Sequence, residues 1–295
     1  MSTATLTPTT STTSTTAEGP PSSPELSPPA APTRTRRALG ALRTGARRSA
    51  AVVLFLLLWE FGTQYLLEPT RKVFLPPLHV VLGALWELAR TGQLQEHLQA
   101  SLTRSVVGFG LAVVAGVVLG IAVAWYDGLR EVLTPLLELF RNTAALVLLP
   151  VFTLLLGIGE LSKVSIVAFA AFFPVLLNTV AGVRTVDPLL VRAARTLGLS
   201  NLQLFLRVVL PSAVPTIFTG VRMAGTASSL VLIAAEMVGA KAGLGYLIVN
   251  AQSSFQIPQM YAGILTVSIF GLAVNTALVR LERRFSGWRT TPHGN

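Results

Sequence analysis

Cysteine is absent from this chain of 295 residues, and charged residues are scarce. Without a thiol, the chain can form no disulfide, no cysteine-ligated zinc site and no iron–sulfur cluster. The three histidines, at positions 79, 97 and 293, are too far apart in sequence to form a close-spaced pair of metal ligands. Asp, Glu, Lys and Arg make up only 12% of the residues, compared with about 25% in an average soluble domain. The shortage of charge argues against a soluble protein.

The charge that is present is mostly basic. Lys and Arg number 23 against 13 Asp and Glu, an excess of 10 that could also suit a nucleic-acid-binding protein. The positions of the bases exclude that class, because they border long uncharged runs instead of forming a basic domain. These runs cover residues 105–126, 142–159, 164–183 and 242–279. Each is long enough to cross a bilayer, which takes about 17–25 apolar residues, and no nucleic-acid partner is expected.

The apolar segments predict an all-α, polytopic membrane protein with about six transmembrane helices. The expected spans are 49–67, 105–126, 140–157, 163–182, 215–238 and 260–280. An even number of spans returns the C-terminus to the side on which the N-terminus lies. Arginines cluster before the first span and after the last one, and basic residues favour the cytoplasmic side. Both termini are therefore expected in the cytoplasm.

The segments outside the spans differ in composition. Residues 1–48 comprise a Ser/Thr/Pro tail, expected to be disordered, followed by an Arg-rich cytoplasmic segment. Residues 68–104 are expected to form an external amphipathic region, which contains a helix on the membrane surface. The core, 105–283, contains a cytoplasmic loop at 183–214, and 284–295 is expected to be a cytoplasmic tail.

The loop 183–214 has the pattern of two short helices with a break between them. Asp187-Pro188 is expected to start the first helix and Gly198 to end it. Ser200 or Asn201 would cap the second helix, and Pro211 would stop it before the next span. Such a helix pair could pack on its own membrane domain or dock on a partner, and amphipathicity alone leaves both open.

The same loop resembles the EAA loop of ABC importer permeases. The residues that carry the resemblance are Ala193, Ala194, Gly198, Val208, Leu210 and Pro211, and Arg192 directly precedes them. Arg192 stands where the family has a glutamate. In that family the loop forms coupling helices that sit in a groove of the ATPase subunit. The resemblance therefore implies that these residues form an ATPase-coupling loop.

Other segments resemble the nitrate/sulfonate/taurine-type branch of the binding-protein-dependent transport inner-membrane components. They include Leu75-Pro76-Pro77, Gly92-Gln93-Leu94, His97, Ser101-Leu102-Thr103-Arg104, Ala235-Glu236-Met237 and the residues from Gly243 to Ile248. This resemblance covers roughly residues 75–283 and implies the type I ABC importer permease fold. It implies a permease for a small, mostly anionic nutrient. An aromatic acid or a vitamin precursor is an alternative cargo, and an ATP-independent secondary transporter is an alternative class.

The resemblance also implies partners and a location. The chain would be a transporter subunit and not an enzyme, since ATP and Mg²⁺ would be bound by a partner ABC ATPase subunit and no cofactor by this chain. The absence of a Gly-x4-Gly-Lys-Ser/Thr phosphate loop agrees with this. The other implied partners are an extracytoplasmic substrate-binding protein, a second copy of the permease as a homodimer, and membrane lipid. The implied location is the bacterial cell (inner) membrane.

Polar residues within the expected spans are candidates for the translocation pathway. They are Asn178, Arg222, Ser228, Ser229 and Glu236. A charge at the centre of a membrane helix costs at least about 2.5–3.5 kcal/mol, so it usually faces a partner or water. The favoured alternatives are that Arg222 reaches lipid phosphates and that Glu236 anchors the following loop. The serines could instead bond to carbonyls of their own helix.

Small residues recur every four positions in the second expected span. They are Ala112, Gly116, Gly120 and Ala124. Small side chains let another helix approach closely. The stripe predicts either a packing seam in the core or a contact between two copies of the chain.

Overall fold

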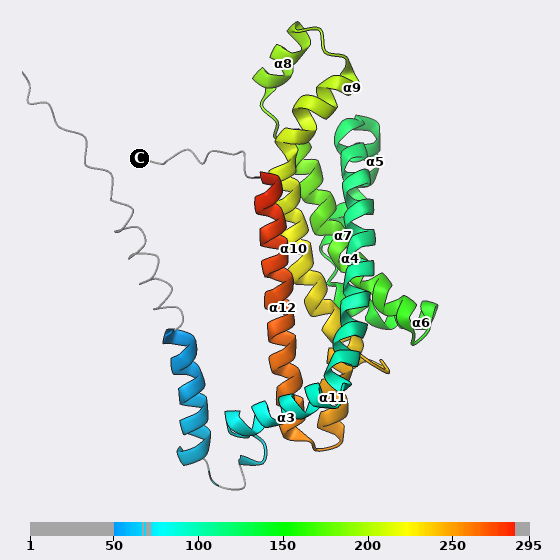
Figure 1. Ribbon diagram of the computed structural model, residues 1–295. Helices are drawn as coiled ribbons and strands as arrows, with labels where there is room; N and C mark the ends of the chain where they lie inside the picture. Colours follow the sequence, from blue (N-terminus) through cyan, green and yellow to red (C-terminus); the bar gives the residue numbers. More distant parts are fainter. Residues whose placement is uncertain (1–49, 67, 69–71, 287–295) are drawn as a thin grey trace, which may run out of the picture. The chain divides into compact units, whose positions relative to one another are not determined.

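The computed structural model describes residues 50–66, 68 and 72–286, and within these ranges the chain is all-α. The chain divides into two units. In the first, residues 1–54, the structure describes only residues 50–54, which begin the apolar helix Ala50–Tyr65. The second unit, residues 55–295, contains the labelled helices (Figure 1). These are α3 Leu78–Arg90, α4 Gln93–Trp125, α5 Asp127–Arg141, α6 Leu149–Leu156, α7 Glu160–Arg184, α8 Pro188–Thr196, α9 Asn201–Leu204, α10 Leu210–Met237, α11 Leu244–Ser253 and α12 Ile257–Ser286. The predicted Ser/Thr/Pro tail, the Arg-rich segment and most of the C-terminal tail lie outside the described residues.

Four described helices are long and apolar enough to cross a membrane. They are Gln93–Trp125, Glu160–Arg184, Asn201–Met237 and Ile257–Arg284. A fifth candidate is a pair of helices, Asp127–Arg141 and Ala145–Leu156, bent by 87° at the break between them. Together with the shorter helix Ala50–Tyr65, these elements confirm an all-α membrane protein, for which six spans is an approximate count.

The predicted third span, 140–157, is wrong as a single helix. The stretch is divided between the end of α5, a 3-10 turn at Ala145–Leu148, and α6. At the break, the Asn142 side-chain amide donates to the Glu138 carbonyl (2.9 Å) and the Thr143 hydroxyl to the Leu139 carbonyl (3.2 Å). These side chains bond to carbonyls in the last turn of α5, and such local bonds compete with continuation of a helix.

The second span begins earlier than the uncharged run that predicts it. Helix α4 starts at Gln93, so its first three turns lie inside the predicted external region 68–104. The amphipathic helix expected in that region is α3, and its buried residues Val81 and Leu88 pack with Leu247 of α11 and Ala262 of α12. The chain itself therefore covers the face with Val81 and Leu88, whereas Leu82 and Trp86 are exposed.

Helix α7 is the centre of the core, with α4 on one side and α10 on another. Glycines allow the close approach of α4. A β-carbon on Gly120 would lie 2.7 Å from the Thr179 Cβ, and one on Gly116 would lie 3.0 Å from the Val175 Cβ. The stripe predicted from the sequence is thus a packing seam within the chain.

Replacing Gly120 with leucine is expected to lower the free energy of unfolding by about 1–3 kcal/mol, because the two helices would have to move apart. Thermal unfolding of the purified protein in detergent measures the effect. Gly110→Leu is the matched control on the same helix, since a β-carbon there has no heavy atom within 4 Å. Equal melting temperatures for the two variants would contradict the seam.

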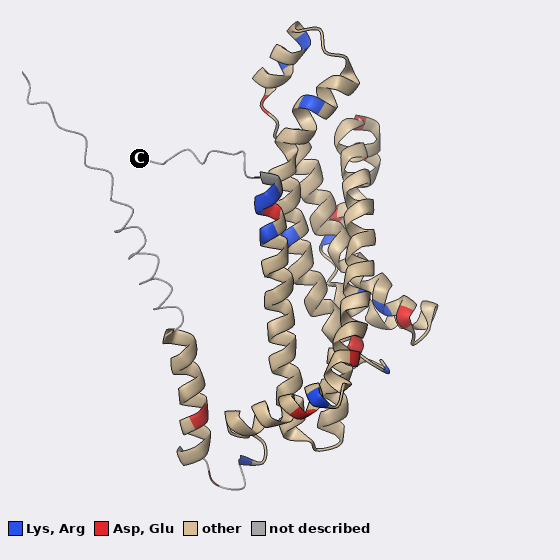
Figure 2. Cartoon of the chain, viewed as in Figure 1, with Lys and Arg blue, Asp and Glu red and all other residues tan. Residues whose placement is uncertain are grey.

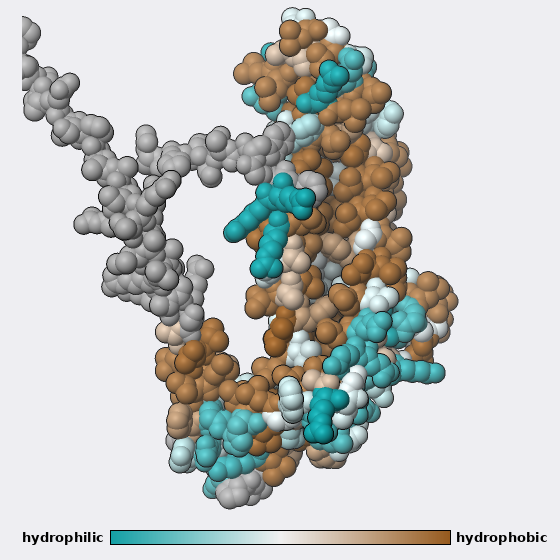
Figure 3. Space-filling model, in the orientation of Figure 1, coloured by the Kyte–Doolittle hydropathy of each residue, from teal (hydrophilic) through white to brown (hydrophobic). Residues whose placement is uncertain are grey.

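The outer surface of the helices is apolar, and few charged residues lie along their length (Figures 2 and 3). On α4 the side chains of Val106, Leu111, Val114 and Val118 are all more than half exposed. In water such a face would be unfavourable. It suits hydrocarbon, where helices satisfy their backbone groups internally.

Candidate functional site

Helix α8 begins and ends where the sequence predicts. The Asp187 carboxylate accepts a hydrogen bond from the Leu189 amide (2.8 Å), and Pro188 is the first helical residue. Gly198 has φ +76°, and its amide donates to the Arg195 carbonyl (3.0 Å) while the Leu199 amide donates to the Ala194 carbonyl (3.2 Å). These bonds close the C-terminal end of the helix and turn the chain toward α9.

The second helix of the loop starts as predicted but does not stop at Pro211. Ser200 and Gln203 form a reciprocal capping box at the start of α9. The chain then continues through a π-helical turn, Phe205–Val209, directly into α10. Pro211 is the second residue of α10 and lies just after the π turn, so it is inside the continuous helical stretch Asn201–Met237. The wide turn joins α9 to the membrane helix without a break.

The loop packs on its own membrane domain with one face and leaves another face exposed. Ala194, Leu204 and Val209 are buried in the same apolar cluster as Val183 and Ala213 of α7 and α10. Facing outward are Leu189, Leu190, Leu197, Leu202, Arg192, Ala193 and Gly198. Of the apolar stripe Leu190, Ala194 and Leu197, only Ala194 is buried. Both uses that the sequence left open are therefore compatible with this geometry.

Beneath α8 lies a cleft of about 480 Å³ with a basic lining. Arg184, Arg192 and Arg195 line it together with apolar residues that include Trp125 and Leu204. No acid is among its lining residues. The loop therefore presents positive charge beside exposed leucines.

Three of the predicted pathway residues bond to their own helices. The Asn178 amide donates to the Pro174 carbonyl (2.8 Å), and Ser228 and Ser229 donate to the Gly225 carbonyl (3.3 and 2.7 Å). The two serines are buried, whereas Asn178 is half-buried. The serines thus bond to a carbonyl of their own helix, which is the alternative that the sequence left open.

Arg222 forms an ion pair with an acid on another helix. Its Nη1 lies 3.2 Å from the Glu282 Oε2 of α12. The pair links α10 to α12, and because the Arg222 side chain is 42% exposed, its contact with lipid phosphates stays a prediction. The five pathway candidates do not converge on one polar site.

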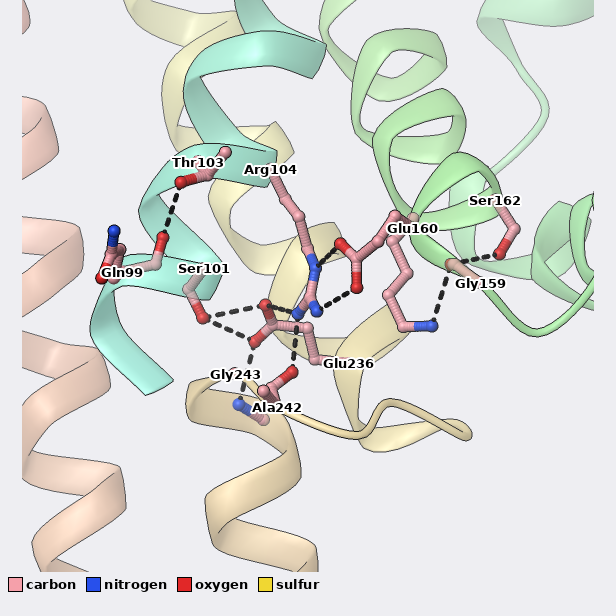
Figure 4. A network of polar contacts seen from close by, with 12 residues as sticks. Gln99, Ser101, Thr103, Arg104, Gly159, Glu160, Ser162, Glu236, Ala242 and Gly243 are labelled. Atoms are coloured by element: carbon pink, nitrogen blue, oxygen red, sulfur yellow. Dashed lines mark hydrogen bonds and ion pairs between the residues drawn. The ribbon is translucent and has the colours of Figure 1, made fainter. Parts of the chain in front are cut away.

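Glu236 lies in the last turn of α10 and is fully buried (Figure 4). Its carboxylate accepts from the Arg104 Nη1 (2.7 Å), the Ser101 hydroxyl (2.8 Å) and the Gly245 amide (3.1 Å). These bonds connect α4, α10 and α11. Glu236 therefore anchors the segment that follows it, as the alternative from sequence proposed.

Arg104 links this carboxylate to a second one. Its Nε and Nη2 donate to both carboxylate oxygens of Glu160 at the start of α7, at 2.5 and 2.6 Å (Figure 4). Its Nη1 also donates to the Ala242 carbonyl (2.7 Å). The side chain of Arg104 is only 4% exposed, and its guanidinium links α4, α7, α10 and the loop before α11.

The glycines after α10 are required by this network. A β-carbon on Gly243, which has φ +126°, would lie 2.4 Å from the Glu236 Cδ. On Gly245 it would lie 2.3 Å from the Ile233 carbonyl oxygen. These positions explain the Gly-x-Gly spacing by close packing. In the ranges that the structure describes, no group of three or more His, Asp or Glu could hold a metal ion.

A second polar feature lies at the bend between α5 and α6. A cleft of about 390 Å³ is lined by residues of α5, the 3-10 turn, α7 and α10, among them Phe140, Arg141, Thr143, Phe173 and Asn178. The Arg141 Nη2 lies 2.7 Å from the Glu138 Oε2, one turn earlier on α5. Both side chains are half exposed. Asn178 is the one pathway candidate that lines this cleft.

Sequence reasoning missed Arg104 and Arg141. Arg104 lies immediately before the uncharged run that defined the second span, and Arg141 lies immediately before the next run. Each was therefore assigned to an edge and not to the membrane interior. The available signal was the segment Ser101-Leu102-Thr103-Arg104, which belongs to the family resemblance but had no role assigned to it.

Comparisons with known proteins agree with the resemblance. Residues 112–287 match the family described as binding-protein-dependent transport system inner membrane component. The chain is 35% identical over 241 residues to the taurine transport system permease protein TauC of Escherichia coli (strain K12), covering 80% of this chain and 86% of that protein. It is 35% identical over 218 residues to the putative aliphatic sulfonates transport permease protein SsuC of Bacillus subtilis (strain 168), covering 74% and 79%.

A solved structure supports the fold. A chain of the MetNI methionine ABC transporter, in an inward-facing conformation, superposes with a TM-score of 0.55 and 15% sequence identity. The match covers 74% of this chain and 99% of that chain. The helices thus have the arrangement of a type I ABC importer permease.

Proposed function

The chain belongs to the family of binding-protein-dependent transport system inner membrane components, and we propose that it carries a small sulfonate, such as taurine, across the membrane. It is a multi-pass ABC importer permease and not an enzyme. The observation that carries the sulfonate assignment is the 35% identity to a taurine permease over 80% of the chain. The same identity to an aliphatic sulfonate permease supports the same chemical class.

In this proposal the loop 183–214 is the contact with a partner ABC ATPase. Its exposed leucines and the neighbouring Arg192 and Arg195 form the docking face, while Ala194 holds α8 on the membrane core. Support comes from the continuous path from α9 through the π turn into α10. A displacement of the loop by the ATPase would move a membrane helix directly.

The remaining partners follow from the same assembly. Both termini and the coupling loop face the cytoplasm of a bacterial cell, and the end with α3 and α11 faces an extracytoplasmic binding protein. Two copies of the permease form the pathway between them. ATP and Mg²⁺ bind the ATPase pair, whose closure moves the coupling loops and opens the pathway outward, and hydrolysis returns it to the inward-open state.

Reconstitution tests the proposal. We expect proteoliposomes containing the permease, its ATPase and its binding protein to take up radiolabelled taurine only when ATP is enclosed with the ATPase. Unlabelled ethanesulfonate should compete, whereas benzoate and a pyrimidine vitamin precursor should not. Uptake that needs no ATP would instead indicate a secondary transporter. Uptake of benzoate or the pyrimidine but not of taurine would overturn the sulfonate assignment.

A further inference from the structure

We propose that Arg141, at the bend between α5 and α6, binds the sulfonate group of the substrate as it crosses the membrane. The proposal rests on the sulfonate assignment above and names a binding residue for it. Arg141 lines the cleft of about 390 Å³ at the break of a bent membrane helix pair. Irregular backbone at membrane depth is tolerated where it is buried in protein or lines a water-filled cavity.

The cleft lies near mid-depth of the membrane helices. Phe140, the neighbour of Arg141, contacts Phe169 and Phe173 of α7, with ring centroids 6.2 and 6.0 Å apart. Phe169 lies nine residues after the start of α7 and 15 before its end. At a rise of 1.5 Å per residue, it lies roughly 14 Å from one end of the helix and roughly 22 Å from the other.

Arg141 is a charged residue at this depth, and such a position is energetically unfavourable. Ionisable groups inside a membrane protein are costly, and by default they mark a pathway for a substrate or an ion. Arg141 is the only charged residue among the described residues that line the cleft. The other lining groups are mainly apolar, with Thr143 and Asn178 as polar exceptions. A small apolar cleft with one convergent cation suits a small anion with a short alkyl chain.

The ion pair of Arg141 with Glu138 leaves further N–H donors of the guanidinium for such a ligand. The guanidinium has five N–H donors in a planar fork, and Nη2 contacts Glu138. A sulfonate offers several anionic oxygens, like the phosphates that arginine binds through two parallel hydrogen bonds. In the absence of substrate, Glu138 neutralises the charge. Its side chain and that of Arg141 are each 50% exposed, so the pair can open toward the cleft.

The other intramembrane arginines are less suited to this role. Arg104 is 4% exposed and is held by two carboxylates and a backbone carbonyl. Arg222 is paired with Glu282 on a different helix, where the pair joins α10 to α12. Arg141 is paired only within its own helix among the described residues, so exchanging that partner separates no helices.

The test uses the complete transporter, with ATPase and binding protein, in proteoliposomes. For Arg141→Gln, we expect the rate of radiolabelled taurine uptake to fall about ten-fold or more, as for loss of a hydrogen-bonded charge. Assembly, basal ATP hydrolysis and the concentration of loaded binding protein that gives half-maximal stimulation should stay unchanged. Arg141→Lys keeps the charge but loses the planar fork, and it should restore part of the uptake.

A second variant separates ligand binding from a structural ion pair. Glu138→Gln breaks the same pair but keeps the guanidinium, and its uptake should stay close to that of the wild type. A pair that only stabilises α5 predicts equal losses for both variants. The matched control is Arg130→Gln, because Arg130 also pairs with an acid three residues earlier on α5, Asp127 at 2.6 Å, but lies outside the cleft.

The outcomes distinguish this proposal from the function on which it rests. If the wild type takes up taurine and Arg141→Gln does so equally well, the role of Arg141 is overturned and the sulfonate assignment stands. If the wild type takes up neither taurine nor ethanesulfonate, both are overturned. If Arg141→Gln does not assemble, the other variants decide: uptake near wild type for Arg141→Lys, or loss for Glu138→Gln, overturns the proposal.

Discussion

Replacing Arg104 with methionine is expected to lower the free energy of unfolding of the permease by about 3–5 kcal/mol. The substitution removes the guanidinium that pairs with Glu236, whose side chain is 0% exposed. The hydroxyl of Ser101 and the Gly245 amide would remain as partners, but neither carries a charge. A buried carboxylate would then lose the cation that is hydrogen-bonded to it, in a place where four helices meet.

Thermal unfolding in detergent measures this effect, and two further variants identify its cause. Glu160→Gln leaves Arg104 paired with Glu236 and keeps an oxygen that can accept a hydrogen bond, so its effect should be smaller than that of Arg104→Met. Changing Arg104 to methionine together with Glu236 to leucine should restore part of the stability, because neither member of this buried ion pair is left without the other. If Arg104→Met melted at the same temperature as Glu160→Gln, the network would not hold this end of the molecule together.

The positions of charged residues in the sequence indicate where a helix enters an apolar environment, but they do not indicate where the helix ends. The prediction 163–182 for the fourth span falls within α7, Glu160–Arg184, because charged residues at both ends of that helix coincide with its termini. The prediction 105–126 for the second span misses the first three turns of α4. Those turns contain polar residues and Arg104, which is buried by contacts with α7 and α10 that hydropathy does not encode.

Local signals in the candidate sites could be read from sequence, whereas partners distant in sequence could not. Asp187, Gly198 and Ser200 act on backbone groups within four residues, so their capping roles follow from residue type and spacing. Ser101 and Glu236 are separated by 135 residues, and only the packing of α4 on α10 brings them together. The bend at Asn142 and Thr143 is a third case, because a run without charge was taken for one span, although two polar side chains in it bond to the preceding turn.

Gly198→Pro is expected to abolish stimulation of ATP hydrolysis by the loaded binding protein while leaving the membrane core folded. Gly198 has φ +76°, which proline, fixed near −65°, cannot adopt. Its amide also donates to the Arg195 carbonyl, a bond that proline cannot make. The turn between α8 and α9 must therefore change direction. Because Gly198 is exposed, with open space around its Cα, the strain should remain within the loop.

The measurement is ATP hydrolysis by the reconstituted transporter, with and without loaded binding protein, alongside the melting temperature of the permease. Gly198→Asn is the matched control, because asparagine tolerates positive φ and keeps the amide proton, so it should retain most of the stimulation. Full stimulation in the proline variant would contradict the assignment of α8 and α9 as the coupling element. Loss in the proline variant alone would show that the direction of this turn matters, because Ala194 on one side and the π turn on the other fix the loop to the helices that must move.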